Sequence, residues 1–380
     1  MGKSLKGKEL GKNISQRKDG RYQARFINRF GQRQTIYAKT LNEIRARLRE
    51  EQYNDVKEVN VVSNNVTLDE WFKIWLETCK QGCRASTKET YTVHYKRIQH
   101  DLGWRKITSL NLVIMQDAIN KLCSDNARKN SKKILVDMLD KAVDTNLLTK
   151  NVAKQINPII TREKKKERRV LTVEETEQFL MQAEGTFYYE LFVLALETGM
   201  RIGELCGLTW EDIDFRDKLL HVRHTLCYFS KGGKYVFEMH DTKTDNGERV
   251  IPLTEKAIKT LKKQKIRKQE IILKGKMPVE GYENLVFVTR NNRPTQQFII
   301  QECMNLIIQR IQKVNENFEA FTPHTFRHSF ATRAIENGMQ PKVLSKLLGH
   351  GQLQITMDLY CHVMEDTLVE EMKKMEQKCV

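Results

Sequence analysis

Two stretches without core-forming residues divide this chain, and they limit its fold more than any other feature. Residues 54–65 show weak hydrophobic periodicity, and residues 159–170 contain the charged run Arg-Glu-Lys-Lys-Lys-Glu-Arg-Arg. Because such segments have little apolar surface to bury, we interpret both as linkers. The sequence therefore predicts three domains, at residues 1–58, 66–158 and 171–380, rather than one body around a single core.

The first part has the pattern of a small sheet with one helix behind it. Residues 21–28 largely alternate polar and apolar side chains, and a second strand is expected at 32–38. Thr40 can cap a helix over residues 41–53. Residues 1–55 hold fourteen Lys/Arg and six Asp/Glu, so their net charge is 14 − 6 = +8. A solvated basic face is one interpretation; the one we favour is that the exposed strand face binds DNA through Arg21, Gln23 and Arg25.

The second part has the pattern of a helical bundle. Thr67 and Glu70 can form a capping box, and apolar residues recur behind it at helical spacing. Further helices are expected to open at Ser86 and Ser109 and to cover residues 126–145. Its aromatic residues fit a hydrophobic core better than a base-stacking platform. On its solvent faces we expect four DNA contacts: Lys88, Lys96, Arg128 and Lys132.

The third part combines helices with short strands. A capping box at Thr172 opens it, an apolar helix over residues 187–198 ends at Gly199, and Thr254 can cap a helix over residues 255–270. Strands are expected at 219–229, 235–239, 249–253 and 285–288, and a long amphipathic helix at 294–314. The coarse expectation is a mainly helical domain with a small antiparallel sheet.

The segment from Thr322 to His328 has features suited to holding a phosphate. Thr322 can cap a helix and Pro323 can be its first residue, which places His324 and Arg327 three apart on one helical face. The backbone N–H groups and the positive end of the helix dipole would converge there. An anion could therefore be held at this helix start.

Two further groups downstream extend this chemistry. His350 follows Gly349 at a predicted helix end, and Tyr360 is the only tyrosine after Tyr282. A tyrosine hydroxyl has a pKa near 10, so it needs a base or a positive field to attack at neutral pH. Guanidinium groups match the oxygens of a phosphodiester bidentately.

Taken in order, the motifs resemble those of one enzyme family. They are Gly-Met-Arg-Ile-Gly-Glu, Thr-Lys-Thr, His-Thr-Phe-Arg-His, Leu-Gly-His and a tyrosine. The chain resembles the tyrosine recombinases, most closely the integrases of temperate phages and conjugative transposons, over essentially all 380 residues. The resemblance implies a multidomain, mainly α fold with small antiparallel sheets. An arm-type DNA-binding domain of sheet plus helix would precede a helical core-site-binding domain and a mixed α/β catalytic domain.

The resemblance also implies a role for each catalytic position. Tyr360 matches the nucleophile, which leaves a 3′-phosphotyrosyl link and a free 5′-hydroxyl. Arg201 and Arg327 match the two arginines that hold the non-bridging oxygens, and Lys243 matches the general acid. Lys243 lies in a turn, where an ordinary solvated lysine is the alternative, and Lys231 and Lys234 lie in a neighbouring hairpin.

The remaining matches are two histidines and a carboxylate. His324 and His350 match two further phosphate or proton-transfer positions, although His328 could substitute for His324. Glu204 matches the acidic residue that orients the first arginine. One departure is visible: Tyr360 follows His350 by ten positions, about one more than in the commonest family pattern, which puts the local loop geometry in question.

The net charge of +17 and the pI near 9.4 favour a polyanionic partner, with double-stranded DNA at core and arm-type sites as the first choice. No apolar run suggests a membrane span, and we expect a cytoplasmic, nucleoid-associated prokaryotic protein. No metal or other cofactor is expected, because His221 and His224 fall in a strand that directs their rings to opposite faces. The scattered cysteines suggest reduced thiols.

The resemblance implies an assembly as well. A C-terminal helix, about residues 366–380, would dock on a neighbouring protomer in a tetramer on DNA, and an excisionase and a host DNA-bending protein could assist. The predicted function is integration and excision of a mobile element through a Holliday junction. Two rivals are a type IB topoisomerase-like enzyme, which relaxes DNA without strand exchange, and a non-catalytic sequence-specific DNA-binding regulator.

Overall fold

The fold is described by a computed structural model. It describes residues 2–5, 7, 9–27, 33–56, 66–161, 169–241 and 247–364. By its internal contacts the chain divides into two compact units, Met1–Glu163 and Lys164–Val380. The centre of the second linker, Lys243 and the predicted C-terminal helix at 366–380 lie outside the described residues.

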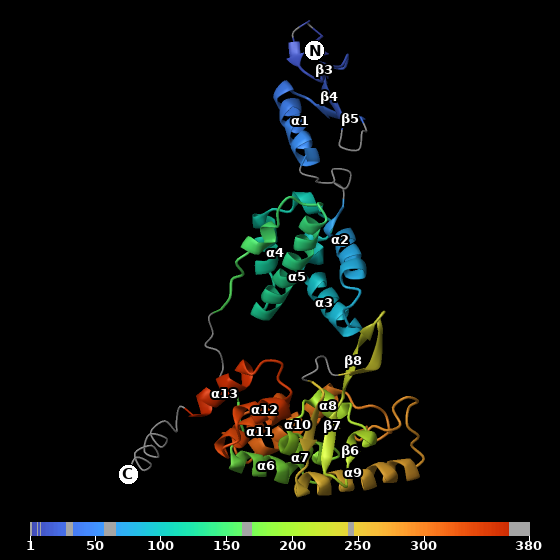
Figure 1. Ribbon diagram of the computed structural model, residues 1–380, viewed down its shortest axis with the longest axis vertical. Coiled ribbons are helices and arrows are strands. Elements are labelled where there is room, and N and C mark those ends of the chain that lie inside the picture. The colour runs from blue at the N-terminus through green and yellow to red at the C-terminus, as the bar shows by residue number, and fades with distance from the viewer. Residues whose placement is uncertain are drawn as a thin grey trace, which may run out of the picture. The chain divides into compact units, whose positions relative to one another are not determined.

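The N-terminal part of the first unit has a three-stranded antiparallel sheet, β3-β4-β5, a two-stranded sheet, β1-β2, and one helix (Figure 1). Strand β4 alternates as its sequence predicts: Tyr22, Ala24 and Phe26 face a core shared with helix α1, and Arg25 is exposed. The three shortest strands were not predicted. The elements are β1 (Gly2–Lys3), β2 (Glu9–Gly11), β3 (Ile14–Gln16), β4 (Tyr22–Ile27), β5 (Arg33–Ala38) and α1 (Leu41–Val56).

The rest of the first unit is helical and has its own hydrophobic core, built around Trp71, Trp75 and Tyr95. Helix α2 begins with the predicted capping box, in which the Thr67 hydroxyl accepts from the Glu70 N–H. The elements are α2 (Leu68–Ile74), a π-helical turn (Trp75–Cys79), α3 (Ala85–Leu102), a 3₁₀ turn (Ile107–Ser109), α4 (Leu112–Asn120), α5 (Asp125–Asp144) and a 3₁₀ turn (Val152–Gln155).

The second unit contains helices around two small antiparallel sheets, one with the order β10-β7-β6 and the other the hairpin β8-β9. Its helices are α6 (Val173–Ala183), α7 (Tyr189–Thr198), α8 (Ile202–Cys206), α9 (Glu255–Leu273), α10 (Gln297–Gln312), α11 (His324–Glu336), α12 (Pro341–Leu348) and α13 (Gln354–Met364). Its strands are β6 (Ile213–Asp214), β7 (Leu219–Val222), β8 (His224–Lys231), β9 (Lys234–Asp241) and β10 (Arg249–Pro252); a 3₁₀ turn (Trp210–Asp212) precedes β6.

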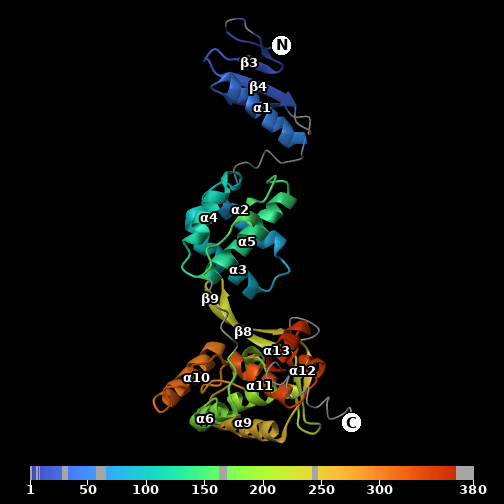
Figure 2. The same ribbon diagram turned by 90° about the vertical axis from the view of Figure 1, so that its left-hand side faces the viewer.

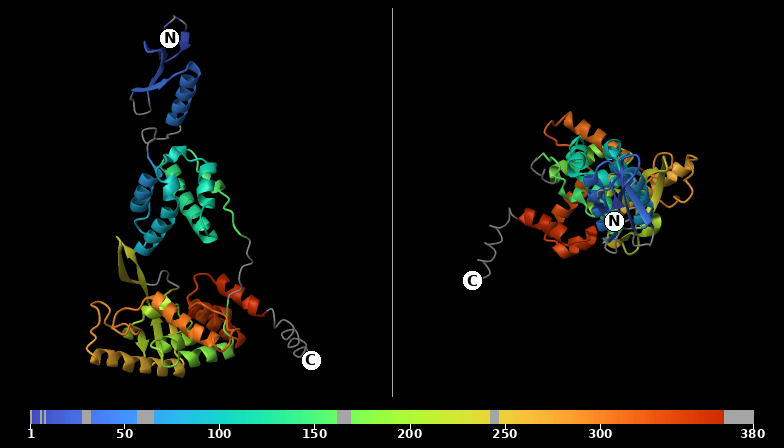
Figure 3. Two further views of the ribbon diagram at one scale, coloured as in Figure 1. Left: turned by 180° about the vertical axis from the view of Figure 1, so that it is seen from behind. Right: turned by 90° about the horizontal axis from the view of Figure 1, so that it is seen from above.

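Within this second unit, α9 forms one side, and α8, α13 and the β8-β9 hairpin lie toward the opposite side (Figures 1 and 2). Figure 3 shows the same order from behind. A large core that includes Phe192 and Phe326 fills the space between them, and a smaller cluster joins α11 to α12. The fold class is therefore confirmed: the chain is mainly helical with small antiparallel sheets.

Several predicted element starts are wrong in detail. Ser86 does not cap a helix, since α3 begins at Ala85 after Arg84, and α4 is capped by Asn111 rather than by Ser109. Thr322 does not cap α11 through its side chain, because Pro323 occupies the cap position. Residues 285–288 form isolated bridges rather than a strand. Side-chain and backbone alternatives compete at such ends, so a Ser or Thr near a helix start is a weak signal of its first residue. Among the described residues, no helix has the length and apolar character needed to cross a membrane.

Candidate active site

Arg201 and Glu204 meet at the start of α8. Gly199 ends α7 in the left-handed conformation (φ 62°), and a Cβ at that position would lie 2.5 Å from the Phe330 side chain. After this turn the Arg201 backbone N–H donates to Glu204 Oε2 (2.9 Å), and the Arg201 guanidinium donates to Glu204 Oε1 (2.7 Å). The Glu204 side chain is only 3% exposed, whereas that of Arg201 is 40% exposed. The carboxylate therefore holds a guanidinium that still faces solvent.

Arg249 is a second arginine on the same carboxylate, and the sequence analysis missed it. It lies at the start of β10, buried, and its guanidinium donates to both Glu204 oxygens at 3.1 and 2.7 Å. Burial alone would raise the pKa of the Glu204 carboxyl, but hydrogen bonds from Arg249 and Arg201 outweigh it and hold that pKa below its usual range. The sequence did contain a signal for this residue. Arg249 is two positions from Ile251, so both side chains lie on the buried face of β10, where a charged residue needs a partner.

Arg327 comes from the first turn of α11 and is also buried, at 3% exposed. Its guanidinium donates to the carbonyl oxygens of Gly199 (3.1 Å) and Leu348 (2.6 Å). Burial and the nearby Arg201 lower the pKa of Arg327 to about 9, so it remains charged at neutral pH. The structure thus brings Arg327 to the segment that carries Arg201, although 126 positions separate them in the sequence.

His350 follows the left-handed Gly349 that ends α12, as the sequence predicted. Its Nδ1 and the hydroxyl of the buried Thr356 share a hydrogen bond of 2.8 Å. Burial, then the positive charges of Arg327 and Arg201, lower the pKa of His350 to about 4. The ring is therefore neutral at neutral pH and lies in the field of the arginines.

His324 lies at the first position of α11 and is exposed, with its ring 5.2 Å from that of His328. The two histidines that the sequence left as alternatives are therefore neighbours. His324 and Arg201 line the same open pocket, of about 500 Å³. The side chains of α10 and β8 complete its wall, among them Thr225, Gln297, Gln301 and Phe298, and Phe298 is 65% exposed. The pocket has a volume in the range of small-ligand sites.

Tyr360 lies on α13, which packs against α11 and α12. Its ring is partly buried against a small apolar cluster that includes Ala331, Ile335 and Leu348. None of the described residues forms a hydrogen bond with its hydroxyl. The candidate nucleophile is therefore held by apolar contacts of its ring with α11, which carries Arg327, and with α12, which precedes His350.

Lys243 lies outside the described residues, so its predicted position has no structural account. Lys231 and Lys234, the other two lysines considered for this role, lie in the hairpin as predicted, where they pair across the turn between β8 and β9. Lys231 is bonded to Glu238 (2.7 Å), which leaves it less available for proton transfer.

The predicted DNA-binding residues of the first unit differ in exposure. Arg25 lies on the outer face of β4, beside the exposed Ile27, whereas Gln23 donates to the Ser15 hydroxyl at 2.9 Å. Arg21 is exposed just before β4. The same face carries Tyr37, opposite Gln23, with the Arg17 guanidinium 5.3 Å from its ring; sequence reasoning missed both.

The helical candidates lie on α3 and α5, which pack together. Lys96 is exposed, and Lys88 and Lys132 are partly exposed. Arg128 is mostly used within the unit, because its guanidinium donates to Asp125 (2.9 Å) and to the carbonyl of Ile159 (3.0 Å). We therefore expect Arg128 to contribute less to DNA binding than the lysines.

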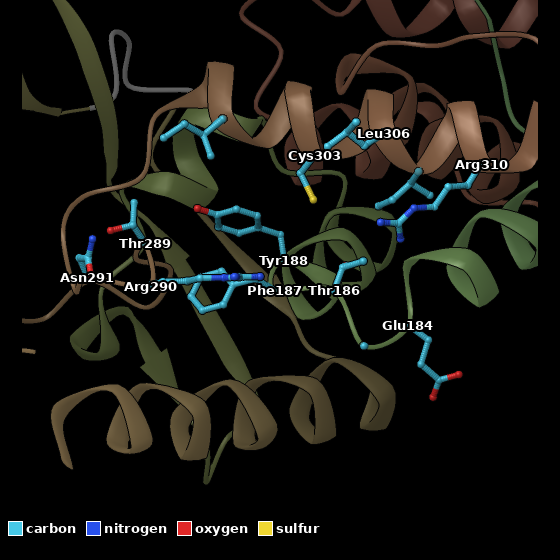
Figure 4. Close-up of a pocket in the computed structure, with 13 residues that line it drawn as sticks. Glu184, Thr186, Phe187, Tyr188, Thr289, Arg290, Asn291, Cys303, Leu306 and Arg310 are labelled. Atoms are coloured by element: carbon cyan, nitrogen blue, oxygen red, sulfur yellow. The ribbon is translucent and has the colours of Figure 1, made fainter. Parts of the chain in front are cut away.

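A larger open pocket, of about 670 Å³, lies beside α10 and contains none of the predicted site residues (Figure 4). Its wall includes the rings of Phe187 and Tyr188, with Cys303 and Leu306 on α10. Two arginines are placed at its edge, and the guanidinium of Arg290 lies 5.7 Å from the Phe187 ring. No group of metal-ligating side chains occurs in the described part of the chain.

Three family models match different parts of the chain. Residues 169–366 match the phage integrase family, residues 67–123 match the N-terminal SAM-like domain of phage integrases, and residues 2–58 match the DNA-binding domain of Tn916 integrase. The transposase of Tn916 from Enterococcus faecalis is 26% identical over 98% of this chain and 96% of its own length. A XerC-like tyrosine recombinase from Caldanaerobacter subterraneus subsp. tengcongensis is 31% identical over 87% of this chain and 88% of its own.

Solved structures give the same result. The Tn1549 transposon integrase in complex with a circular intermediate DNA is 25% identical and superimposes with a TM-score of 0.67 over 81% of this chain and 99% of that one. Lambda integrase bound to a core site, at 19% identity, shares the fold, with a TM-score of 0.57 over 93% of this chain and 95% of that one. The family model covers more than half of the chain, and it includes every residue of the arginine and histidine cluster. The chain therefore belongs to the phage integrase family, the tyrosine recombinases, which break and rejoin DNA.

Proposed function

We propose that this recombinase integrates and excises a mobile element by cutting and rejoining DNA at specific sites. Its relatives include the transposases of Tn916 and Tn1545. The observation that carries the proposal is the arginine cluster on Glu204, which presents the partly exposed Arg201 beside His324 and next to Arg327 and His350. Arg201 is 40% exposed beside these positive charges, so an anion is the partner that this surface favours.

The anion is the scissile phosphodiester. Arg201 and Arg327 would bind its non-bridging oxygens, and His324 would add a contact at the edge of the same pocket. Because these groups are fixed before DNA arrives, they stabilise the charge of the five-coordinate transition state without further reorganisation. Arg327 uses two of its five N–H groups on carbonyls, so the others remain to bind phosphate.

The covalent step balances as a transesterification. The Tyr360 oxygen forms a bond to phosphorus, the bond from phosphorus to the 5′ oxygen breaks, and the 3′-phosphotyrosyl link keeps the bond energy for rejoining. The tyrosine proton needs an acceptor, and the neutral ring of His350 is suited to accept it. The leaving 5′ oxygen needs a proton, which we assign to Lys243. The attack of a 5′-hydroxyl from another duplex reverses these steps, and two such exchanges pass through a Holliday junction.

The surface around the phosphate would bind the flanking DNA. The pocket that contains Arg201 and His324 also has Phe298 and two glutamines, which can contact a base face and base edges. Residues 66–158 would bind the core site and residues 1–58 an arm-type site, with the basic linker 159–170 following the backbone between them. Two binding modules on one chain raise the effective concentration of each at its site.

Assembly into a tetramer would use the C-terminal residues. The sequence at 366–380 places Leu368, Val369, Met372 and Met375 at helical spacing among acidic and basic residues. The pocket beside α10, with an apolar wall and two arginines, is a suitable acceptor on a neighbouring protomer. Removing residues 366–380 and changing Leu306→Glu should both weaken synapsis in a gel-shift assay, while DNA binding by the monomer remains. An excisionase and a host DNA-bending protein would control direction on the nucleoid of a prokaryotic host.

The decisive experiment uses a nicked suicide substrate that carries the cognate core site. We expect a covalent protein–DNA band on denaturing electrophoresis, and we expect Tyr360→Phe to abolish it while leaving the DNA affinity within about threefold of wild type. A band that persists in Tyr360→Phe would show that another residue is the nucleophile.

The two rival functions give different outcomes in the same assay. A non-catalytic regulator gives no covalent band with any DNA that it binds specifically. A type IB topoisomerase-like enzyme gives the band and relaxes supercoiled plasmid, but it yields no recombinant product from two sites. Recombinant product from a plasmid that carries two sites would therefore exclude both.

A further inference from the structure

Arg249 makes four hydrogen bonds that join three separate segments. Its guanidinium donates to the two oxygens of Glu204, to the carbonyl of Leu347 (2.6 Å) and to the carbonyl of Gly247 (3.3 Å). Its side chain is 4% exposed. Four of its five N–H groups are thus used within the protein, whereas Arg327 uses two of its five and Arg201 remains 40% exposed. Any contribution to the reaction must pass through the groups that it binds.

Those groups are the supports of the proposed catalytic residues. Glu204 holds Arg201, and Leu347 lies in the last turn of α12, three residues before His350. Gly247 follows Lys243 by four positions. One buried side chain therefore ties the segment that carries the phosphate-binding arginine to the segment that carries the neutral histidine.

Arg327 forms a second tie between two of these segments. It donates to Gly199, next to the Arg201 turn, and to Leu348, next to the residue that Arg249 binds. The two guanidiniums thus bridge residues 199–204 to residues 347–348 in parallel. Arg327 keeps three N–H groups outside these bonds, which are those proposed above to bind the phosphate, whereas Arg249 keeps one.

The charges give Arg249 a second effect. Glu204 is the one carboxylate bonded to these arginines in the described structure, and its two oxygens accept from both Arg201 and Arg249. If Arg249 is removed, a buried carboxylate keeps Arg201 as its only charged partner. The full negative charge of Glu204 would then act on Arg201 and weaken its attraction for the phosphate.

We propose that Arg249 is a positioning residue for DNA cleavage, which shares Glu204 with Arg201 and fixes the His350 segment in place. This inference rests on the proposed function, since it assigns Arg249 to the same site. The guanidinium fork is required, because one donor pair must fill both Glu204 oxygens while the Nε donates to Leu347. A lysine keeps the charge but cannot make these bonds together.

The test compares single-turnover cleavage rates with DNA affinities for a set of variants on the suicide substrate. We expect Arg249→Gln to slow cleavage by about 10²-fold and Arg249→Lys by about tenfold, with Kd for the core site changed less than about threefold. The matched control is Arg267→Gln, which also removes the arginine partner of a buried carboxylate, Glu190, but away from the site. It should lower Tm as Arg249→Gln does and leave the cleavage rate near wild type.

A double variant separates positioning from folding. If Arg249 acts through Glu204, the variant Glu204→Gln with Arg249→Gln should cleave no more slowly than the slower single variant. Additive losses, or equal slowing by Arg267→Gln at the same loss of Tm, would overturn the proposal. Wild-type cleavage in the same assay is the reference, so the absence of any covalent band would contradict the proposed function rather than the role of Arg249.

Discussion

The two halves of the proposed site are held in different ways. The arginine half, Arg201, Arg249 and Arg327 with Glu204, is fixed by short hydrogen bonds, and three of these four side chains are almost fully buried. The nucleophile half is helix α13, which rests on α11 and α12 through the partly buried Leu359 and Tyr360. Among the described residues, its one side-chain hydrogen bond with the site is the partly buried bond between Thr356 and His350.

This difference indicates where the energetic cost of organising the site falls. The arginine half is arranged on folding, so it can stabilise a phosphate as soon as DNA is bound. Shifting α13 breaks one polar bond and a small apolar cluster, whereas shifting Arg249 breaks four hydrogen bonds. We infer that the position of Tyr360 is the adjustable element of the site, which suits an enzyme that must not cut before its partners are assembled.

The largest combined effect on catalysis and stability is expected for Arg327. Arg327→Ala should slow cleavage by about 10²–10³-fold or more, through loss of a transition-state contact. It also leaves the buried carbonyls of Gly199 and Leu348 without a donor, so we expect a fall in Tm of roughly 2–12 °C. Suicide-substrate kinetics and thermal unfolding measure the two effects.

Tyr360→Phe is the matched comparison from the other half. It abolishes covalent cleavage, but the Tm should change by less than about 2 °C, because the ring packs through its apolar atoms and the hydroxyl has no partner among the described residues. An Arg327→Ala variant as stable as Tyr360→Phe would contradict the difference drawn between the two halves.

Sequence reasoning reached most of this architecture, for identifiable reasons. Apolar periodicity and two capping boxes, at Thr67 and Thr172, located helices correctly, because these signals are local. The order of the motifs identified Arg201, Glu204 and Arg327, which the structure brings together. The shortest strands, β1 to β3 and β6, escaped because two or three residues give no measurable period.

Arg249 could not be assigned by the same reasoning, for a physical reason. Its role depends on a carboxylate 45 positions away and on a carbonyl 98 positions away, and both contacts exist only after folding. A backbone carbonyl leaves no trace in a sequence pattern. The two-residue spacing between Arg249 and Ile251 in a strand could show that Arg249 is buried, but not which residues it binds.

The next largest effect is expected from a variant that weakens the apolar contact of α13. Leu359→Ala removes a partly buried side chain from the cluster that joins α13 to α11 and α12, so Tyr360 should be less well placed. We expect cleavage to slow by about ten- to a hundredfold, since small misplacements of a reacting group are costly. The matched control is Leu353→Ala, an exposed side chain just before α13, which should leave the rate unchanged.

The outcome of that pair decides how α13 is held. If Leu359→Ala cleaves as fast as wild type on the suicide substrate, the contacts seen without DNA do not position the nucleophile. The arginine half would then be the only part of the site arranged on folding.

A smaller effect is expected from a variant that removes the hydrogen bond between the two halves, between Thr356 and His350. Thr356→Val replaces the buried hydroxyl by a methyl group of similar size and leaves His350 Nδ1 without its partner. A single hydrogen bond contributes about 0.5–1.5 kcal/mol, so we expect cleavage to slow by about two- to thirteenfold. Thr356→Ser keeps the hydroxyl and should restore most of the rate. Equal rates for the Val and Ser variants would show that this hydrogen bond does not contribute to cleavage.

The smallest expected effect is a pH dependence of stability that arises from His350, which lies in the field of the arginine half. Burial and the charges of Arg327, Arg201, Arg249 and His328 depress the pKa of His350 to about 4 in the folded protein, below its ordinary value of 6.5. Between these values the unfolded chain binds a proton that the folded chain does not, so the contribution of His350 to stability falls as the pH falls from about 6.5 to about 4. Wild type should therefore lose more Tm than His350→Asn between pH 7.5 and 5.5. An equal loss in both would mean that burial and the arginines do not keep His350 neutral. A bound phosphate analogue should reduce the difference, because it offsets the charge of the arginines.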